Sequence, residues 1–490
     1  MPHKLSSRKA QHMTAPPSSR FGALFGEGRA LAAMVLAGGV GLQAMETFIG
    51  STLLPSIVGD IGGLELFAWN STVFVVASIF ASIFAAVRPL GLGPRGTYIA
   101  ATVTFALGSL LCALAPSMPI LLVGRAVQGF GGGLLTALSY SMIRLVFPER
   151  LWGSAFALIS GVWGVSTLIG PAIGGIFASF DGWRWAFFVL VPVAALLGLA
   201  ARRVVPAQSG ERGMPRFPIL QILLLVGAVL SVSVASILTE GALLPALLVG
   251  LAVLAITMLG VIDRHRETHL LPTGTFTPGS VIGLLFASML LINMAIVCDI
   301  FVPLFLQQLH GQSPLIAGYM LALVAVGWSG GSMLTSSWTG PRARLLLLAG
   351  PVLQLGACIG LALTVGIDNT AGHLMPLLPI GVSLVALGAG IGISWPQISS
   401  RLLHAAPKGE GDLTSASMSM VQLFASGLGA ALAGVIVNGA GLAASPGLAT
   451  TIGAAHWLFG LFALVPLLAL PVVWALVRNE RARALIQPAQ

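Results

Sequence analysis

Charged residues are scarce in this sequence. Only 8% of its 490 residues are Asp, Glu, Lys or Arg, and 56% are apolar, whereas a water-soluble domain carries about 25% charged residues. A chain with so few charges cannot cover a water-exposed surface of this size. The scarcity of charge therefore excludes a soluble protein and indicates one that is embedded in a lipid bilayer.

Cysteine is also scarce, and the three cysteines do not form a recognisable site. Cys112, Cys298 and Cys358 all fall within apolar segments, which argues against a disulfide framework and against a metal cluster. The chain has no Gly-Lys-Ser/Thr phosphate-binding loop, so ATP is not the expected source of energy. No pattern of a nucleophile with its base stands out. We therefore expect no metal, no cofactor and no enzymatic activity.

Long apolar runs, by contrast, are abundant. A run of about 20 apolar residues is long enough to cross a bilayer as a helix. The predicted fold is an all-α, polytopic membrane protein. Fourteen transmembrane helices are expected near 30–50, 67–87, 96–115, 118–143, 153–178, 185–201, 218–239, 242–262, 279–305, 314–337, 345–366, 374–400, 415–437 and 455–477. The polar, basic start of the chain lacks the apolar core of a signal peptide, so the first span is expected to direct insertion.

The basic residues test this topology independently. If the N-terminus is cytoplasmic, Arg184 lies outside and Arg125 lies within a span, which leaves 22 of the 24 Lys and Arg on the cytoplasmic side. Such an excess marks cytoplasmic loops, and adding or dropping one span would destroy it. We therefore expect both termini in the cytoplasm. The Ala- and Arg-rich composition with only three lysines suggests a bacterium, so the expected location is its inner membrane. The net charge of +9 then needs no nucleic-acid partner.

An internal repeat predicts the domain organisation. Gly93, Pro94 and Arg95 match Gly340, Pro341 and Arg342 at the same place in the topology. The prediction is a basic N-terminal tail and a short C-terminal tail, two halves of six helices, and two extra helices between the halves. The tails are residues 1–29 and 478–490, the two halves are 30–203 and 279–477, and the extra helices are 217–263. Transporters built from such repeats bind substrate near the bilayer midplane, between the halves.

Three motifs carry a family resemblance. They contain Glu46, Thr47, Leu54 and Pro55 in the first helix, Arg125, Gln128, Gly129 and Gly131 in the fourth, and Gly170, Pro171, Gly174 and Gly175 in the fifth. In this order they resemble the major facilitator superfamily, in particular its fourteen-span drug:proton antiporter family. The resemblance implies proton-coupled multidrug efflux. In the fifth-helix motif the glycines allow close helix contact and Pro171 bends the helix.

The loop after the second helix departs from the family pattern. Ala86 and Leu90 stand where the family has Gly and Asp, although Gly93 and Arg95 remain. That loop latches the cytoplasmic side in the family. The resemblance therefore does not say how this chain closes there.

Three ionisable residues, Glu46, Arg125 and Asp299, are expected deep in the membrane. Each costs roughly 3 kcal/mol to insert, so each is a functional candidate by default. Glu46 and Arg125 should lie at similar depth and form an ion pair or a water-bridged contact. Glu46 would then alternate between proton-bound and ionised forms, because burial favours the neutral acid and a nearby Arg favours the carboxylate. The alternative is a fixed pair that only holds the first and fourth helices together.

Asp299 has no counterpart in the family motifs. It is a candidate for a second proton site, for an attractor of cationic substrates, or for an acid at the outer mouth. A substrate cavity needs apolar walls and a few polar points. The candidates for those points are Gln43, Asn70 and Asn293.

The sequence therefore predicts export of lipophilic, often cationic compounds by alternating access, driven by the proton gradient. Its expected partners are the lipid bilayer, small lipophilic substrates and protons, and the chain is expected to be a monomer. Whether a periplasmic adaptor joins is left open. One alternative is a dedicated exporter of a natural product, lipid or siderophore. A non-transporting membrane sensor or a membrane-embedded enzyme is another, and the two deep carboxyls argue against it.

Overall fold

A computed structural model describes residues 24–486 of the chain, except 27, 88–91, 149–150, 208–217, 239–240, 242, 267–268 and 339. Most of the predicted N-terminal tail, the end of the C-terminal tail and Leu90 lie outside the described residues. Those that are described form helices and no strand. Helices are required here because lipid offers no partner to an open backbone N–H or C=O.

Fourteen helical segments are long and apolar enough to cross a membrane, as the sequence predicts. The first six are α2 (Ala30–Ile61), α3 (Phe67–Val87), α4 (Gly93–Ala113), α5 (Met118–Val146), α6 (Trp152–Ser179) and α7 (Trp183–Val204). The next two are α8 (Ile219–Ile237) and α9 (Leu243–His265). The last six are α10 to α11 (Val281–Leu309), α12 (Pro314–Thr335), α13 (Gly340–Thr364), α14 (Leu377–Ala405), α15 (Gly411–Gly439), and α16 (Leu448–Phe462) with α17 (Leu464–Ile486).

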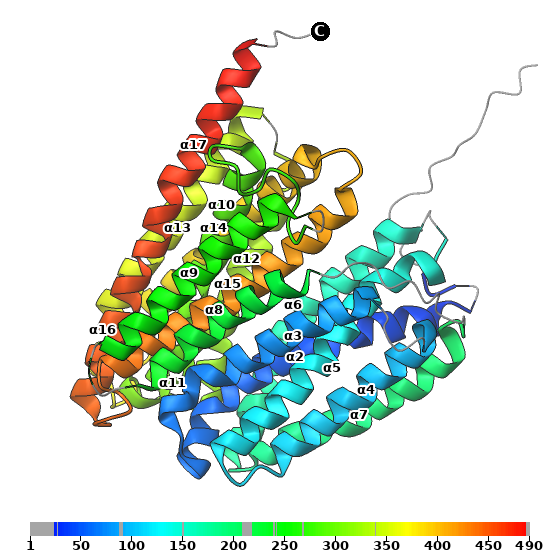
Figure 1. Ribbon diagram of the computed structural model, residues 1–490. Coiled ribbons are helices and arrows are strands. Elements are labelled where there is room, and N and C mark those ends of the chain that lie inside the picture. The colour runs from blue at the N-terminus through cyan, green and yellow to red at the C-terminus, as the bar shows by residue number, and fades with distance from the viewer. Residues whose placement is uncertain are drawn as a thin grey trace, which may run out of the picture.

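The helices lie in two groups that diverge toward the end where α17 finishes (Figure 1). We call this end the inner end and the opposite one, where α2 ends and α3 begins, the outer end. Within the first group α2, α4 and α5 pack against α6, α7 and α3, and within the second α14 packs against α12 and α13. The two groups meet where α6 and α2 contact α12, and where α3 contacts α15.

The two extra helices differ in their environment. α8 packs against α15 and also contacts α3, whereas α9 packs mainly against α8. Only 17% of the most apolar stretch of α9 is buried, compared with 56% for α8. α8 is therefore part of the packed structure, and α9 presents most of its surface outward.

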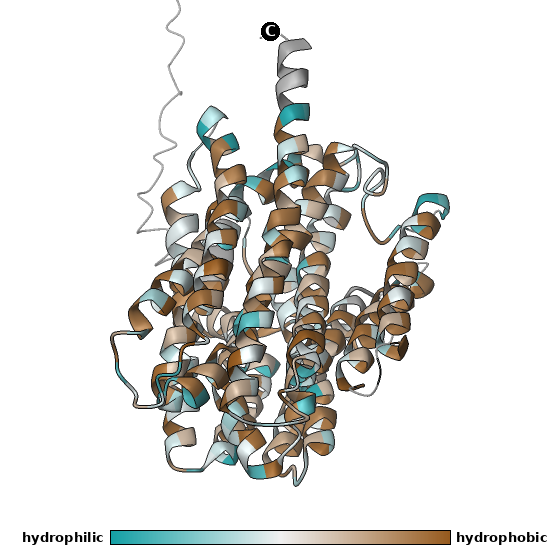
Figure 2. Cartoon of the chain, turned by 90° about the vertical axis from the view of Figure 1, so that its left-hand side faces the viewer, coloured by the Kyte–Doolittle hydropathy of each residue, from teal (hydrophilic) through white to brown (hydrophobic). Residues whose placement is uncertain are grey.

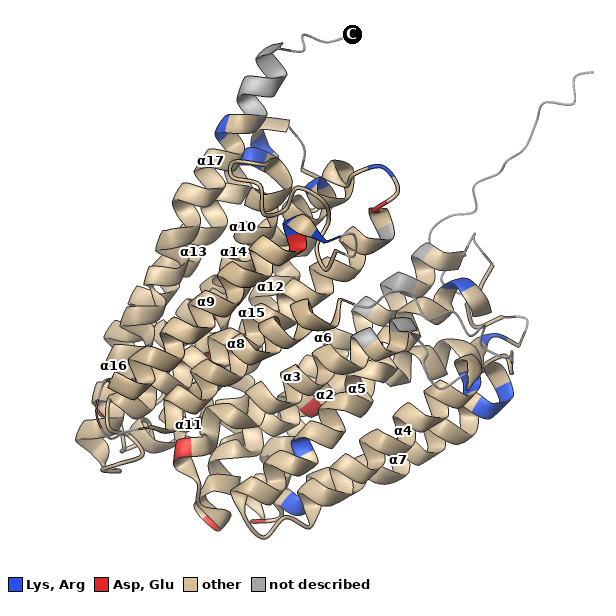
Figure 3. Ribbon diagram, viewed as in Figure 1, with Lys and Arg blue, Asp and Glu red and all other residues tan. Residues whose placement is uncertain are grey.

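The surface agrees with a bilayer environment. Apolar residues dominate the sides of the helices, and polar ones gather at helix ends and in loops (Figure 2). Side chains such as Leu196, Leu254 and Leu378 are more than half exposed, and so much exposed apolar surface needs lipid around it. Most of the described Lys and Arg residues lie at the inner end (Figure 3).

The ninth span is interrupted, which the sequence analysis did not predict. α10 (Val281–Ile296) ends in a 3-10 turn, η3 (Val297–Phe301), before α11 (Val302–Leu309) continues. The cause is Pro303, because a proline has no N–H to donate and its ring clashes with the carbonyl four residues earlier. That carbonyl belongs to Asp299, and it accepts instead from the N–H of Val302.

Candidate functional site

The structure brings Glu46 of α2 and Arg125 of α5 into direct contact. The carboxylate atom Oε1 of Glu46 pairs with a terminal nitrogen of the Arg125 guanidinium. The Glu46 side chain is completely buried, and that of Arg125 is 3% exposed. Gly50 lies one turn further along α2, where a Cβ would stand 3.2 Å from Glu46 Oε1. The absence of a side chain at this position leaves room for the pair.

Arg125 is also held by three other groups. Its NH1 donates to Oε1 of Gln128 at 2.7 Å, and its Nε donates to the backbone carbonyl of Asn70 at 3.4 Å. The guanidinium stacks over the ring of Phe74, 4.3 Å from the ring centre. Gln128 in turn donates to Ser109 of α4 at 2.9 Å. The guanidinium is thus fixed by α3, α4 and α5 together.

Glu46 has fewer partners than Arg125. Its second oxygen, Oε2, accepts no hydrogen bond from any residue that the structure describes. A buried carboxylate with one open oxygen can take up a proton there without first breaking a hydrogen bond. The pair therefore combines a fixed cation with an acid whose protonation would remove its partner charge.

The three predicted polar points of the cavity lie in different places. Gln43 is one turn before Glu46 on α2, and its Oε1 accepts from the Thr136 hydroxyl of α5. Asn70 contacts Arg125 through its backbone. Asn293 is buried in α10, where its amide donates to the carbonyl of Met289 in its own helix at 2.8 Å. No described contact joins Asn293 to the ion pair.

Asp299 lies in the 3-10 turn η3, at the interruption of the ninth span. Its side chain is half-buried. Its carboxylate makes no hydrogen bond or ion pair with the part of the chain that the structure describes. It does not join the Glu46–Arg125 pair, so it forms a separate acidic position.

The fifth-helix motif forms a close contact between the two groups of helices. A Cβ on Gly175 would lie 2.5 Å from the Cα of Leu315 in α12, and one on Gly170 would lie 2.5 Å from Cβ of Phe48 in α2. Gly174 stands over Thr52 of α2, and the ring of Pro171 faces Gly318 of α12. The motif therefore joins α6 to both α2 and α12 near the outer end.

Residues that support the pair were missed by the sequence analysis. Phe74 and Ser109 carry no motif, and an aromatic or a hydroxyl in an apolar helix is too common to single out. Their positions one turn from Asn70 and within reach of Gln128 become meaningful only once α3, α4 and α5 are packed together.

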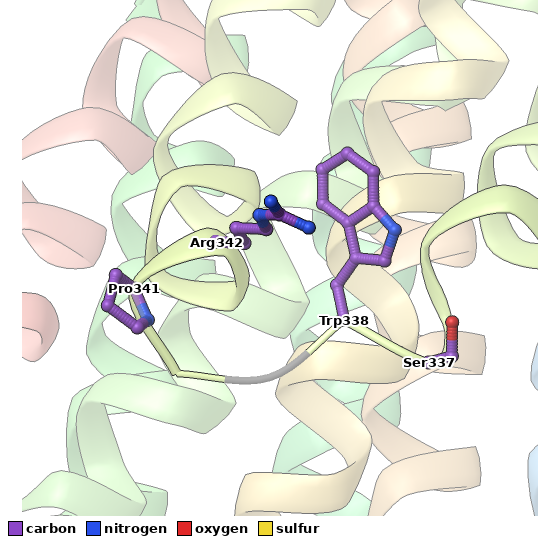
Figure 4. Close-up of a pocket in the computed structure, with 4 residues that line it drawn as sticks. All are labelled: Ser337, Trp338, Pro341 and Arg342. Carbon is purple, nitrogen blue, oxygen red and sulfur yellow. The ribbon is translucent and has the colours of Figure 1, made fainter.

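A surface hollow lies far along the chain from this pair, in the loop between α12 and α13. Its volume is about 640 Å³, and it is lined by Ser337, Trp338, Pro341 and Arg342. The side chains of Trp338 and Arg342 extend to the same side of the loop (Figure 4). The hollow is at the inner end and contains none of the predicted site residues.

Comparison with known proteins identifies the family. The model of the major facilitator superfamily matches residues 36–434. The chain belongs to the major facilitator superfamily. A probable multidrug-efflux transporter of Mycobacterium tuberculosis is 37% identical over 432 residues, which cover 85% of this chain and 90% of that protein. The multidrug efflux pump SdrM of Staphylococcus aureus is 27% identical over 297 residues, 59% of this chain and 64% of the pump.

Solved structures of other transporters share the fold. A crystal structure of the peptide transporter POT covers 91% of this chain and 95% of its own, with a TM-score of 0.65 at 14% sequence identity. At this identity the likeness concerns the fold alone. The helices of this chain are therefore arranged as in that transporter.

Proposed function

We propose that this protein is a proton-coupled exporter of lipophilic compounds, working by alternating access in the bacterial cytoplasmic membrane. The observation that carries the proposal is the buried contact between Glu46 and Arg125 within a major facilitator fold. Replacing a buried ion pair by apolar packing is often neutral or stabilising, so a purely structural pair is a weak explanation for the two charges. A buried pair with one carboxylate oxygen left open favours a residue that gains and loses a proton. The names of the multidrug-efflux relatives support the same function.

The orientation follows from charge. Most of the described Lys and Arg lie at the inner end, and such residues are retained on the cytoplasmic side. With the inner end in the cytoplasm, the helices meet on the periplasmic side through Gly175 and Gly318. In this arrangement the protein is ready to take up substrate from inside.

The proposed cycle couples this arrangement to the proton gradient. Once the two groups rock and the outer end opens, a periplasmic proton binds to Oε2 of Glu46 and removes the charge that faces Arg125. Return to the present arrangement releases the proton to the cytoplasm and restores the ion pair. Each proton that moves down 100 mV supplies about 2.3 kcal/mol, enough for a gradient of roughly 40-fold.

The experiment is transport into inverted membrane vesicles, with a panel of cationic, neutral and zwitterionic compounds, with and without an uncoupler. The proposal expects accumulation of several lipophilic compounds that stops when the uncoupler is added. Accumulation that persists with the uncoupler would overturn proton coupling. Transport of one compound alone would favour a dedicated exporter instead.

A further inference from the structure

Two seams connect the two groups of helices. One runs between α6 and α12, and the other between α3 and α15. Both are closely packed at the outer end. Gly175 contacts Leu315 across the first seam. Across the second, a Cβ on Gly434 would lie only 2.8 Å from Cβ of Ala68. The seams differ further in, and this difference bears on how a substrate reaches the interior.

α8 covers the seam between α3 and α15. Near the outer end Trp69 of α3 donates to the carbonyl of Ser233 in α8 at 2.9 Å. The amide of Asn438 in α15 donates to the backbone carbonyl of Glu65, just before α3, at 2.8 Å and to that of Ser236 in α8 at 2.9 Å. These hydrogen bonds fix α8 across the seam.

The cover extends toward the inner end. Ile222, Leu225 and Val229 of α8 share one hydrophobic cluster with Ile79 of α3 and Phe424 of α15. Ile79 is twelve residues beyond the start of α3 at Phe67, which corresponds to about 18 Å along a helix. α8 therefore closes this seam over more than half of the bilayer's apolar thickness of about 30 Å.

The seam between α6 and α12 has no such cover. On α6, Gly164 lies two turns inward from Pro171 on the same face, yet it is exposed and a Cβ there would meet no atom within 4 Å. On α12, Ser329 lies three turns inward from the buried Gly318, and it is exposed too. Among the described helices, α2 packs against both α6 and α12, and it is itself largely buried. The inner halves of α6 and α12 thus face open space.

The residues around this opening are apolar. Trp163 and Val165 of α6 are 37% and 55% exposed, and Val326 of α12 is 51% exposed. Neither helix carries a charged residue between Trp152 and Ser179 or between Pro314 and Thr335. A compound dissolved in the lipid could pass such walls without losing favourable polar contacts.

We propose that lipophilic substrates enter from the inner leaflet of the bilayer between the inner halves of α6 and α12, and that α8 closes the equivalent path between α3 and α15. The inference rests on the proposed export function and names its route of entry. Entry is one-sided because the two extra helices lie over one seam only. The substrates that suit this route partition into the membrane before they bind.

The test places a removable obstacle in the opening. Gly164→Cys is purified and reconstituted, then treated with methyl or benzyl methanethiosulfonate, so that a small or a large apolar group is added to protein that has already folded. The three native cysteines are completely buried, and the unmodified chain treated in the same way reports any background. Gly227→Cys on α8 is the matched control, because a Cβ there also meets no atom within 4 Å.

The readout is the rate at which a membrane-partitioning fluorescent dye binds, without a proton gradient. The benzyl group at position 164 should slow association and dissociation several-fold and leave Kd unchanged, because an obstacle on the path alters both rates equally. The methyl group should have less effect, and position 227 none. An unchanged association rate with the benzyl group at 164, or an equal fall at 227, would overturn the route.

Two further measurements separate the parts of the inference. A bilayer-soluble maleimide should label Gly164→Cys and leave Val76→Cys unlabelled, since α8 covers Val76 of α3. Rapid labelling at 76 would overturn the role of α8. Because dye binding needs no gradient, a wild-type chain that binds dye but fails to export it would contradict the proposed function and leave the entry rates readable.

Discussion

Arg125 is the fixed member of the ion pair, and Glu46 is the member that can change. A guanidinium stays protonated in proteins and presents several donors in one plane. Arg125 uses these donors on Gln128, on the backbone of Asn70 and on Glu46. Removing the charge of Glu46 leaves the other contacts of Arg125 in place, so the chain can hold an unpaired Arg125 during part of a cycle.

Glu46→Gln should abolish uphill export while the substrate still binds, because glutamine keeps the shape of the acid and cannot carry its proton. The measurement is transport by purified protein in liposomes under an imposed pH gradient, with dye binding measured in parallel. Asp60→Asn is the control on the same helix, since Asp60 pairs with Arg184 at the surface, where both are more than a third exposed. Full proton-dependent export by Glu46→Gln would remove Glu46 from the mechanism.

Asp299→Asn tests the second acidic position. If this carboxylate is a second proton site, it permits a two-proton, electrogenic exchange, and its loss should remove the dependence of cation transport on membrane potential. Neutral substrates should suffer less, because they need no counter-charge in the cavity. The measurement is uptake into inverted vesicles under imposed voltage at fixed pH, for a monovalent cation and a neutral dye. A variant that keeps the voltage response would make Asp299 a bystander.

At the scale of helices, α6 shows how one sequence motif sets a close contact. Gly175→Ala should separate α6 from α12 near the outer end, since the new Cβ would stand 2.5 Å from backbone of Leu315. We expect a loss of about 1–3 kcal/mol in stability and a large loss of export. Thermal unfolding and vesicle transport measure the two effects. Gly227→Ala on α8 enters open space and should behave as wild type, and equal behaviour of the two variants would contradict the contact.

The loop at the end of α11 contains a buried histidine that should make stability depend on pH. Nε2–H of His310 donates to the carbonyl of Val365 at 3.0 Å, and Nδ1 accepts from the amide of Asn369 at 3.4 Å. Burial lowers the pKa of His310, and this outweighs the opposing effects of the Val365 hydrogen bond and of nearby Asp368. The unfolded chain therefore binds a proton more readily than the folded one, so stability falls as pH drops through about 6.5.

This loss of stability should appear in thermal unfolding in detergent between pH 7.5 and pH 5. His310→Gln should unfold at a lower temperature at neutral pH, and its curve should depend less on pH. His456 is exposed, so His456→Gln serves as the control and should keep the wild-type pH dependence. A His310→Gln variant with an unaltered pH slope would show that another group causes it.

The helices could be predicted well because the membrane imposes their length and composition. Fourteen apolar runs became fourteen spans. The helix ends were predicted less accurately. The first span was expected to end at residue 50, since Ser51, Thr52 and Pro55 resemble a helix end, but α2 continues to Ile61. Within it the Thr52 hydroxyl donates to the carbonyl of Phe48 in its own helix. The 3-10 turn at Asp299 was missed, since a proline in a membrane helix bends it in some contexts and interrupts it in others.

The site could be predicted in part, because inserting a charged side chain into a membrane costs free energy. A charge inside a membrane is rare, so Glu46 and Arg125 stood out, and their motif positions implied similar depth. The cavity role of Asn293 stays a prediction, because a polar residue in an apolar run can also bond to its own helix, as Asn293 does to Met289. Phe74 could not be found without the packing of α3 on α5.

At the scale of the whole molecule, the two extra helices break the symmetry of the repeat. The two seams between the helix groups are equivalent by topology, but α8 lies over one of them. The loop after α9 is fixed to the start of α15, where the carboxylate of Glu410 accepts from the N–H of Thr273 at 2.7 Å. α8 and α9 should therefore move with the second group of helices during the cycle.

The distribution of charge gives the last prediction, which concerns the sidedness of the whole chain. Position 209 lies outside the described residues, in the basic segment between α7 and α8, and Ser445 is exposed in the loop between α15 and α16 at the outer end. Lys and Arg resist translocation, so their excess at the inner end predicts that position 209 is cytoplasmic and position 445 periplasmic.

Cysteines introduced at these two positions should react with a membrane-impermeant maleimide from opposite sides. Background is low because Cys112, Cys298 and Cys358 are completely buried. Intact cells should label 445 alone, and inverted vesicles should label 209 alone. Seven spans lie between the two positions, so labelling of both from one side would mean an even number instead and would contradict both the fourteen-span topology and the cytoplasmic uptake route.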